Sequence, residues 1–448
     1  MKSAKNHPLI VGTLILTLTG LLSRIIGFFY RIYLSRLFGE EGMGLYQLLS
    51  PVLSITFSLT AAGYQTAISK LVAEQSAASK TPSLRPMFAG LSISIPLSLL
   101  CNFAIYLGAD FIAGVLIQEP RVASMLRILS FSVPLSAVHS CVNGYFYGTK
   151  QAGIPAASQL LEQMTRVGCV FLVSARCFAE GKTPSVGVAV LGLTVGELFS
   201  MLFSAVAIWY CILKGPRFHN SNHAASASVL YRGLLSMALP LTANRLVLNL
   251  LQSVESVSIP ARLRLYGYDN VTALSVYGVL TGMAMPFIFF PNALTSSVAV
   301  LLLPLISENY ALGNHAAVRQ ATVKTVKYCG LMGICCMAVF VLFGKWAGTT
   351  LFNSPLAGYF ITTLGFICPF LYLDTTLSSI LQGLGKAGHI FVMNVICLLL
   401  RLAFVFFAVP DFGITGYLWG LLTSQLTLGI LYLVCLYRFL RGHKNSAV

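Results

Sequence analysis

Two arginines lie inside the first long apolar run of the sequence, where charge is unusual. The run extends from Leu9 to about Leu49 and contains Arg24 and Arg31, although about 20 apolar residues suffice to cross a bilayer. The two arginines are seven residues apart, which is about two helical turns, or about 10 Å, along one face. Because an arginine that faces lipid is costly, we expect both to face a polar interior, where their guanidinium groups suit an anion such as phosphate. For Arg31 an alternative is that its side chain reaches the outer interface beside Arg36, and the same alternative applies less strongly to Arg24, which lies nearer the middle of the span.

Further charged residues lie within other apolar runs. Glu162 and Arg166 are four residues apart, in the order that favours an ion pair, so we interpret them as a structural pair. Arg401 has Cys397 where such an acid would stand, so its partner comes from another helix, from cavity water or from a substrate. The candidate residues for binding an anionic substrate are therefore Arg24, Arg31, Arg245 and Arg401. Three more acids, Glu197, Glu255 and Asp374, complete the set within the apolar runs.

The composition places these residues in a multi-pass membrane protein. Of 448 residues, 56% are hydrophobic and only 9% are charged, which is more apolar than a soluble protein of this size. The apolar runs are continuous over about 20 residues, which favours helices over the alternating pattern of a barrel. The net charge of +16 lies mostly in short loops and sets orientation, so nucleic-acid binding is not expected. The eleven cysteines show no metal-ligand spacing, and neither a metal nor a cofactor is expected.

The apolar runs predict about twelve transmembrane helices in two lobes. The N-lobe is expected at 1–213 and the C-lobe at 234–448, separated by a polar linker at 214–233 that is rich in Ser, Asn and His. The first run is too long for a signal peptide and is expected to remain as the first span. The later spans are expected at Tyr46–Leu71, Met87–Ile117, Ala123–Tyr147, Pro155–Cys177, Ser185–Leu213, Leu234–Ile259, Thr272–Ile306, Val323–Phe352, Leu356–Leu381, Ile390–Val409 and Gly416–Leu440.

The distribution of lysine and arginine predicts the orientation. With the N-terminus in the cytoplasm, sixteen basic residues fall in cytoplasmic segments and seven on the opposite side. This bias favours cytoplasmic locations for both termini, as an even number of spans requires. We therefore expect a protein of the cell membrane. No loop is long enough to form a soluble catalytic domain, and no catalytic constellation is present, so an enzyme is not expected.

The two halves of the chain contain an internal repeat. Seven residues between Leu129 and Arg166 recur as identical residues at a constant shift of 235, among them the pair Pro134 and Pro369. The sequence Arg36-Leu37-Phe38-Gly39 is echoed by Arg264-Leu265-Tyr266-Gly267 at a different shift, as an insertion would produce. Because each half has six expected spans, the repeat is parallel and is expected to enclose a central cavity between two lobes.

Two titratable residues occupy the same position of this repeat. His139 and Asp374 are related by the shift of 235, and either could carry a proton across the membrane. The alternative is a hydrogen-bonded polar group near a helix break at Pro134 or Pro369. His139, Glu197, Glu255 and Asp374 are therefore the candidates for coupling transport to protons or sodium.

Three segments resemble a known family. They read SRIIGFFYRIYLSRLFGEEGMGLYQL from Ser23, GYQTAISKLVAE from Gly63 and YGTKQAGIPAASQLLEQMTRV from Tyr147. These segments are similar to the polysaccharide biosynthesis (stage V sporulation protein B-like) family. That family belongs to the flippase superfamily that also contains lipid II flippases and the multidrug and toxin extrusion exporters. The resemblance runs through most of the chain and is strongest from Ser23 to about Arg166.

The resemblance implies two six-helix lobes and a flippase for an undecaprenyl-diphosphate-linked sugar or peptidoglycan precursor, moved from the cytoplasmic to the outer leaflet. In lipid II flippases a Ser-Arg pair in the first helix contributes to a basic cavity, and Ser23-Arg24 matches it. The chain departs from those flippases in having about twelve expected spans instead of fourteen. The anionic lipid-linked glycan and the bilayer are thus the expected partners.

Two other functions fit parts of the pattern. A cation-coupled multidrug and toxin extrusion antiporter needs a carboxylate in the N-lobe cavity, and Glu197 is the acid that could serve there. A scaffold for spore or wall assembly that transports nothing predicts that the arginines within the spans are dispensable. The arginines of the first span favour the anionic cargo over the antiporter.

Overall fold

The described part of the chain is almost entirely helical. The computed structural model describes residues 8–79, 83–214 and 227–442, and the side chains of 16–77, 83–213 and 227–439. It is 92% helical, and no strand occurs among the described residues. Ten of the described helices are long and apolar enough to cross a membrane, or up to 11 spans if a bent pair is included. The structure therefore confirms the predicted class of a multi-pass helical membrane protein.

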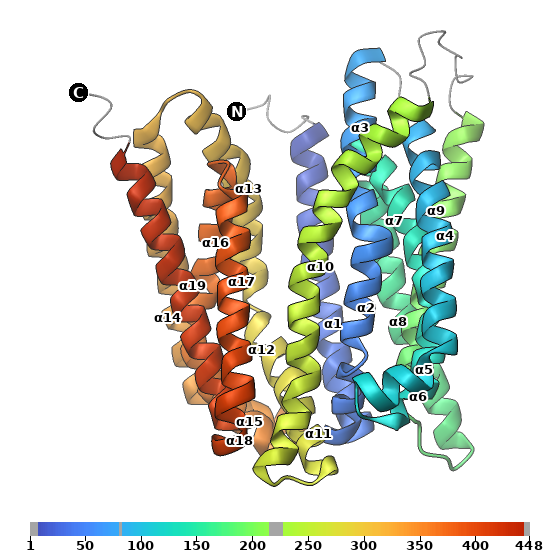
Figure 1. Ribbon diagram of the computed structural model, residues 1–448, viewed down its shortest axis with the longest axis vertical. Helices are drawn as coiled ribbons and strands as arrows, with labels where there is room; N and C mark the ends of the chain where they lie inside the picture. Colours follow the sequence, from blue (N-terminus) through green and yellow to red (C-terminus); the bar gives the residue numbers. More distant parts are fainter. Residues whose placement is uncertain (1–7, 80–82, 215–226, 443–448) are drawn as a thin grey trace. The chain divides into compact units, whose positions relative to one another are not determined.

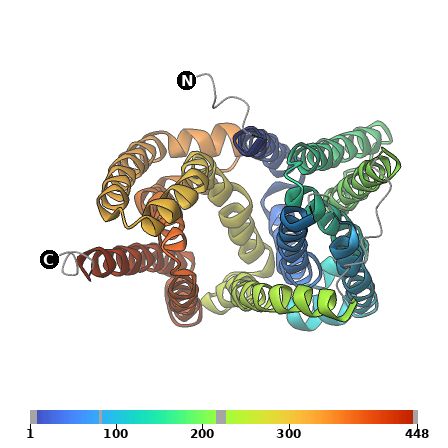
Figure 2. The ribbon, with the colours of Figure 1, turned by 90° about the horizontal axis from the view of Figure 1, so that it is seen from above.

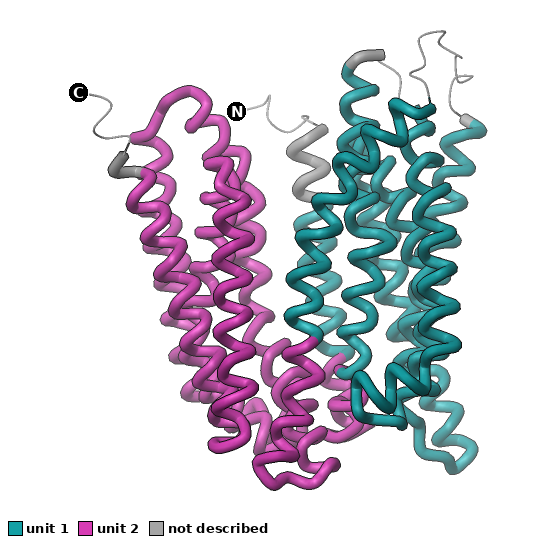
Figure 3. Tube along the Cα trace, in the orientation of Figure 1, with its two compact units in different colours: residues 1–30, 48–253 teal, residues 31–47, 254–448 magenta. Residues whose placement is uncertain are grey.

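The chain forms two compact units (Figure 3). Unit 1 comprises 1–30 and 48–253, and unit 2 comprises 31–47 and 254–448. Two helices of 40 residues, α1 (Pro8–Gln47) and α10 (Ala227–Tyr266), contribute to both units. The grouping differs from the predicted lobes for 31–47, which belong to unit 2, and for 234–253, which belong to unit 1, because each long helix passes from unit 1 into unit 2 partway along its length. Part of the predicted linker lies outside the described residues, and its end, from Ala227, is already helical.

Unit 1 is a bundle of roughly parallel helices (Figures 1 and 2). Helix α8 packs against α9, while α7 packs against α3, α4 and α9. Its core is built around apolar side chains that are completely buried, such as Ile68, Cys141 and Phe146. Besides α1 and α10, its elements are α2 (Ser50–Phe57), η2 (Ser58–Ala62), α3 (Gly63–Ser79), α4 (Arg85–Leu107), α5 (Ala109–Phe111), η3 (Ile112–Leu116), η4 (Pro120–Val122), α6 (Ala123–Ser130), α7 (Ser132–Gly148), α8 (Gly153–Ala179) and α9 (Gly187–Lys214).

Unit 2 is a second bundle, organised around α16. This helix packs against α13, α14 and α19, and its Leu377, Ile380 and Leu381 are completely buried. The elements are α11 (Asn270–Gly278), η5 (Val279–Ala284), α12 (Met285–Phe289), α13 (Asn292–Ala311), α14 (His315–Phe352), α15 (Pro355–Leu364), η6 (Gly365–Ile367), α16 (Cys368–Gly383), α17 (Ala387–Ala403), η7 (Phe404–Ala408), α18 (Val409–Phe412) and α19 (Ile414–Gly442).

The internal repeat is visible in the backbone as well as in the sequence. Gln118 and Asn353 are related by the shift of 235, and both adopt left-handed conformations, with φ of 60° and 53°. Lys150 and Gly385 are related by the same shift, with φ of 61° and 74°. Positive φ is uncommon for residues other than glycine, so its recurrence at equivalent positions is unlikely to arise by chance. The turns between helices thus follow the repeat that the sequence identities predict.

The echoed Arg-Leu-aromatic-Gly sequences mark two turns. Gly39 has a φ of 69° and divides α1 into helical segments at 8–38 and 40–47. Gly267 has a φ of 113° and directly follows the end of α10 at Tyr266. Both glycines therefore occupy conformations that other residues rarely adopt, at the end of the first long helix of each half.

One predicted span needs correction. The eighth was expected as one span at Thr272–Ile306, but the structure breaks it at Phe290 and Pro291 into 270–289 and 292–311. Proline lacks the N–H that would continue the helical hydrogen bonds. The fifth span is present as α8, 27 residues long. It is absent from the ten strongly apolar helices because Glu162 and Arg166 lie in its middle.

Candidate functional site

The two candidate arginines of unit 1 have exposed side chains. Arg24 lies on α1 and Arg245 on α10, and both are exposed within long apolar helices. Ser23, the neighbour of Arg24, is 5% exposed. Arg31 is partly buried and lies in the part of α1 that belongs to unit 2. Because lipid is a costly environment for arginine, we still expect both side chains to face a polar interior, and this location stays a prediction.

Arg166 donates a hydrogen bond to Glu162 along α8, as their spacing predicts. The bond joins Nη2 of Arg166 to Oε1 of Glu162, and each side chain is 16% exposed. Gly196 of α9 faces this turn so closely that a Cβ there would lie 2.9 Å from the carbonyl oxygen of Glu162. The contact is therefore enclosed between two helices, and the structural role of the pair stays a prediction.

A second contact between titratable side chains lies next to this pair. Nε2 of His139 on α7 is 2.8 Å from Oε2 of Glu197 on α9, with exposures of 11% and 16%. The side-chain amide of Asn143 is 3.4 Å from Nδ1 of the same imidazole. His139, Glu162 and Glu197 offer ligand atoms that all lie within 4.8 Å of one another. Two carboxylates and one arginine leave a single negative charge, which a proton on His139 or a bound monovalent cation would balance.

In unit 2 the structure identifies the partner of Arg401. Nη2 of Arg401 on α17 donates to Oε2 of Glu255 on α10 at 2.6 Å. The hydroxyl of Tyr417 on α19 donates to Oε1 of the same carboxylate at 2.8 Å. Glu255 is only 5% exposed, so its charge is compensated inside the helix packing. Of the three sources considered for this partner, another helix is the one observed.

Asp374 has a different environment from the other acids. It lies on α16, is 6% exposed, and neither carboxylate oxygen has a hydrogen-bond partner among the described residues. Helix α19 passes close by, because a Cβ at Gly429 would lie 3.1 Å from Oδ1. An unpartnered buried carboxylate is costly, which makes Asp374 a candidate for binding a proton or a cation.

Two charged residues of unit 2, Asp374 and Arg401, occupy positions of the repeat equivalent to those of titratable or charged residues in unit 1. The four residues of unit 1 are His139, Glu162, Arg166 and Glu197. At a shift of 235 they become Asp374, Cys397, Arg401 and Tyr432. The arginine is retained, whereas the acid moves from the positions of Glu162 and Glu197 to that of His139. The sequence could have revealed Tyr432 as the equivalent of Glu197. It could not have revealed the contact between His139 and Glu197, because these residues are 58 positions apart and lie on separate helices.

Two helical units built from repeated elements, with exposed basic and buried acidic residues inside apolar spans, define a multi-pass membrane transporter. The model of the family described as polysaccharide biosynthesis protein matches residues 9–310, and that described as MatE matches residues 264–407. The chain belongs to the polysaccharide biosynthesis protein family, within the superfamily of flippases and exporters that the sequence segments indicate.

Individual proteins support the same family assignment. The chain is 30% identical to stage V sporulation protein B of Bacillus subtilis (strain 168) over 426 residues, covering 94% of this chain and 82% of that protein. Its fold is similar to a lipid II flippase MurJ in an inward closed conformation, with a TM-score of 0.72, 14% identity, and 95% and 87% of the two chains covered. It is also similar to an inward-facing multidrug resistance transporter, with a TM-score of 0.71, 16% identity, and 95% and 96% covered.

Proposed function

We propose that this transporter flips an undecaprenyl-diphosphate-linked oligosaccharide or peptidoglycan precursor from the inner to the outer leaflet by alternating access. One observation carries the proposal. Within the spans, Arg24 and Arg245 are exposed, whereas the side chains of Glu162, Glu197 and Glu255 are at most 16% exposed. The charge that these spans expose is therefore positive.

The chemistry of a lipid diphosphate matches this charge. A diphosphate brings at least two negative charges into a poorly solvated space, where the planar donors of arginine bind phosphate oxygens in pairs. Arg24 and Arg245 lie in the same unit and are the proposed contacts, with Arg31 as a further candidate. Arg401 is assigned instead to the ion pair with Glu255, because that pair already uses its Nη2.

The relatives support the class of cargo. One similar structure is a lipid II flippase, and the relative of 30% identity acts in sporulation according to its name. The bias of basic residues supports the cell membrane and cytoplasmic termini. No covalent step is proposed, since transport needs only binding and movement.

Depletion of the protein in its cell tests the proposal. We expect an undecaprenyl-diphosphate-linked intermediate to accumulate in the inner leaflet, and re-expression of the wild-type chain to clear it. If lipid-linked intermediates are unchanged while an organic cation accumulates in the cytoplasm, the proposed cargo is wrong.

A second function, cation-coupled extrusion, is favoured by one observation. The buried and unpartnered carboxylate of Asp374 is suited to exchange a proton or sodium ion, and it lies within the segment that matches the MatE model. Asp374→Asn is expected to abolish uptake of organic cations into proteoliposomes if the protein is an antiporter of this kind. In a flippase without such coupling, the same variant would flip the lipid at the wild-type rate.

A further inference from the structure

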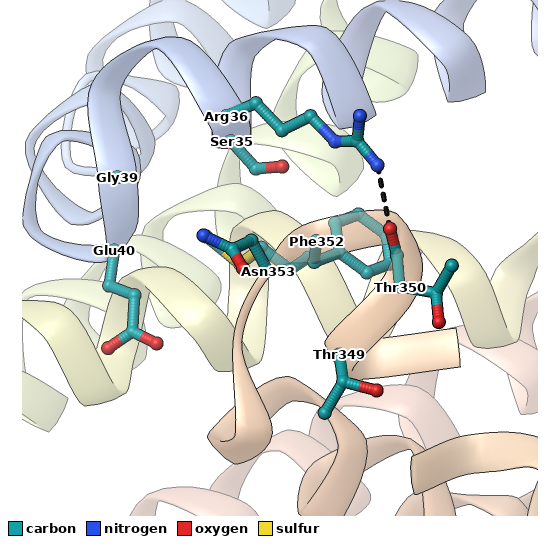
Figure 4. A pocket seen from close by; sticks show the side chains of 9 residues that line it. Ser35, Arg36, Gly39, Glu40, Thr349, Thr350, Phe352 and Asn353 are labelled. Atoms are coloured by element: carbon teal, nitrogen blue, oxygen red, sulfur yellow. Dashed lines mark hydrogen bonds between the residues drawn. The ribbon is translucent and has the colours of Figure 1, made fainter. Parts of the chain in front are cut away.

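A pocket of about 460 Å³ opens beside the turn at Gly39, within unit 2 (Figure 4). Its volume is within the range of about 300–1,000 Å³ found for small-molecule sites. One wall comes from the end of α1 and the other from the end of α14. The lining residues are Ser35, Arg36, Gly39, Glu40, Met283, Thr349, Thr350, Phe352 and Asn353.

The two charges of the pocket are of opposite sign and are held by different groups. Arg36 donates from Nε to the carbonyl of Leu351 at 2.9 Å and from Nη2 to that of Thr350 at 2.6 Å, which satisfies carbonyls at the C-terminus of α14. The hydroxyl of Ser354 donates to Oε1 of Glu40 at 2.5 Å. The pocket therefore has no net charge, in contrast to the exposed arginines at Arg24 and Arg245, and does not select an anion.

Hydrogen-bonding capacity remains on both sides of the pocket. A guanidinium has five N–H donors and a carboxylate accepts about four hydrogen bonds, so neither Arg36 nor Glu40 is saturated by the contacts above. The hydroxyl of Thr349 donates to the carbonyl of Lys345, four residues earlier, at 3.1 Å, and its oxygen can still accept a hydrogen bond. In Figure 4 the amide of Asn353 points toward the part of α1 that carries Ser35 and Glu40. Each of these groups suits a ligand whose hydroxyls both donate and accept.

An apolar floor completes the site. Phe352 is 3% exposed and Met283 is 1% exposed, yet both line the pocket. An apolar surface surrounded by mixed donors and acceptors suits a sugar ring, which has C–H groups on its face and hydroxyls at its rim. We propose that this pocket binds an uncharged sugar unit of the headgroup. The proposal rests on the proposed function for its source, a lipid-linked glycan, and on the predicted orientation for its location at the outer end of the first helix.

The variant Thr349→Val/Asn353→Gly tests the site without disturbing its frame. Asn353 has a φ of 53°, a conformation that glycine adopts freely, so the change removes the amide and keeps the turn. Valine keeps the shape of Thr349, and the contacts of Arg36 and Glu40 remain. The matched control is Thr363→Val, because the hydroxyl of Thr363 also donates to the carbonyl four residues earlier, at 2.9 Å, and does not line the pocket.

The measurement is saturation-transfer NMR of N,N′-diacetylchitobiose with the full-length protein in lipid nanodiscs. We expect saturable binding that weakens about tenfold in the double variant, as the loss of two hydrogen bonds predicts. The Thr363→Val control should bind like wild type, and inorganic pyrophosphate should not displace the sugar. Absence of saturable binding to wild type, equal binding by the double variant, or displacement by pyrophosphate would each overturn the proposal.

The outcome of the sugar-binding experiment can be distinguished from the outcome of a test of the proposed function. Sugar binding that weakens in the double variant, together with wild-type transport by Arg24→Ala, would support the pocket and remove the diphosphate site. Loss of transport in Arg24→Ala without any sugar binding would remove the pocket and leave the diphosphate site in place.

Discussion

Arg401→Met should destabilise unit 2 strongly, because it leaves the carboxylate of Glu255 buried with one remaining partner. That carboxylate is 5% exposed and accepts hydrogen bonds from Arg401 at 2.6 Å and from Tyr417 at 2.8 Å. Methionine fills a similar volume without charge. After the substitution the hydroxyl of Tyr417 alone would have to compensate a full negative charge.

The magnitude follows from the energetics of buried pairs. Removal of one partner of a buried ion pair costs about 3–5 kcal/mol. For a cooperative unit of 150–250 residues, 1 kcal/mol lowers Tm by about 2–4 °C, so the expected decrease is roughly 6–20 °C. Tyr417→Phe removes one hydrogen bond to the same charged group and should cost about 1.5–3 kcal/mol. The double variant Glu255→Gln/Arg401→Met removes both charges and should recover at least half of the loss.

Thermal unfolding in nanodiscs of fixed lipid composition, followed by tryptophan fluorescence, provides the comparison. The control is Arg319→Met, since Arg319 is exposed on α14 in the same unit and its replacement should change stability by less than about 0.5 kcal/mol. An Arg401→Met protein as stable as this control would refute the pair. So would a Glu255→Gln/Arg401→Met protein whose loss of stability equals the sum of the losses measured for Glu255→Gln and for Arg401→Met alone.

Two further predictions concern orientation and a helix end. Reporters fused after Val448 and inserted between His219 and Ala227 should both indicate the cytoplasm, as the basic bias requires, and an external signal from either would contradict the predicted topology. Asp269 precedes α11, and hydrogen bonds from Thr272 and Val271 hold the pKa of its carboxyl below the ordinary value. Because the folded pKa is lowered, its contribution to stability is present above the ordinary carboxyl pKa and is lost as pH falls. Asp269→Ala should therefore lower Tm at pH 7 and have a smaller effect near pH 3, whereas an equal difference in Tm at both pH values would contradict the cap.

The fold was predictable where residue type restricts the backbone or the environment. The apolar runs predict helices, and the repeated prolines and glycines indicate that the two halves share features of their helix packing. Gly148 and Gly383 illustrate this, because a Cβ at either would lie within 3.0 Å of another helix, of the carbonyl oxygen of Ser69 and of Leu303 respectively. The left-handed turns at Gln118 and Asn353 were not predictable, because neither residue type demands positive φ.

The charged contacts were predictable only within a helix. The Glu162 and Arg166 pair follows from a spacing of four residues. The pairing of Arg401 with Glu255 spans 146 residues and depends on how α10 and α17 pack, which the pattern of one sequence does not specify. The break at Phe290 and Pro291 was missed for a related reason, since prolines are also tolerated inside spans, as Pro96 and Pro304 are in α4 and α13.

The charge at Arg24 is the central element of the proposed function. Arg24→Ala removes the positive charge from an exposed position of α1 without changing the loops that set orientation. Arg24→Lys keeps the charge but loses the paired donors of the guanidinium. A purely structural arginine would instead affect the amount of inserted protein in both variants.

The most direct measurement is the rate of lipid-diphosphate flipping per inserted molecule in proteoliposomes that contain wild type, Arg24→Lys or Arg24→Ala at matched density. We expect Arg24→Ala to abolish flipping and Arg24→Lys to retain part of it. Flipping by Arg24→Ala at the wild-type rate would contradict the proposed contact between this arginine and an anionic cargo.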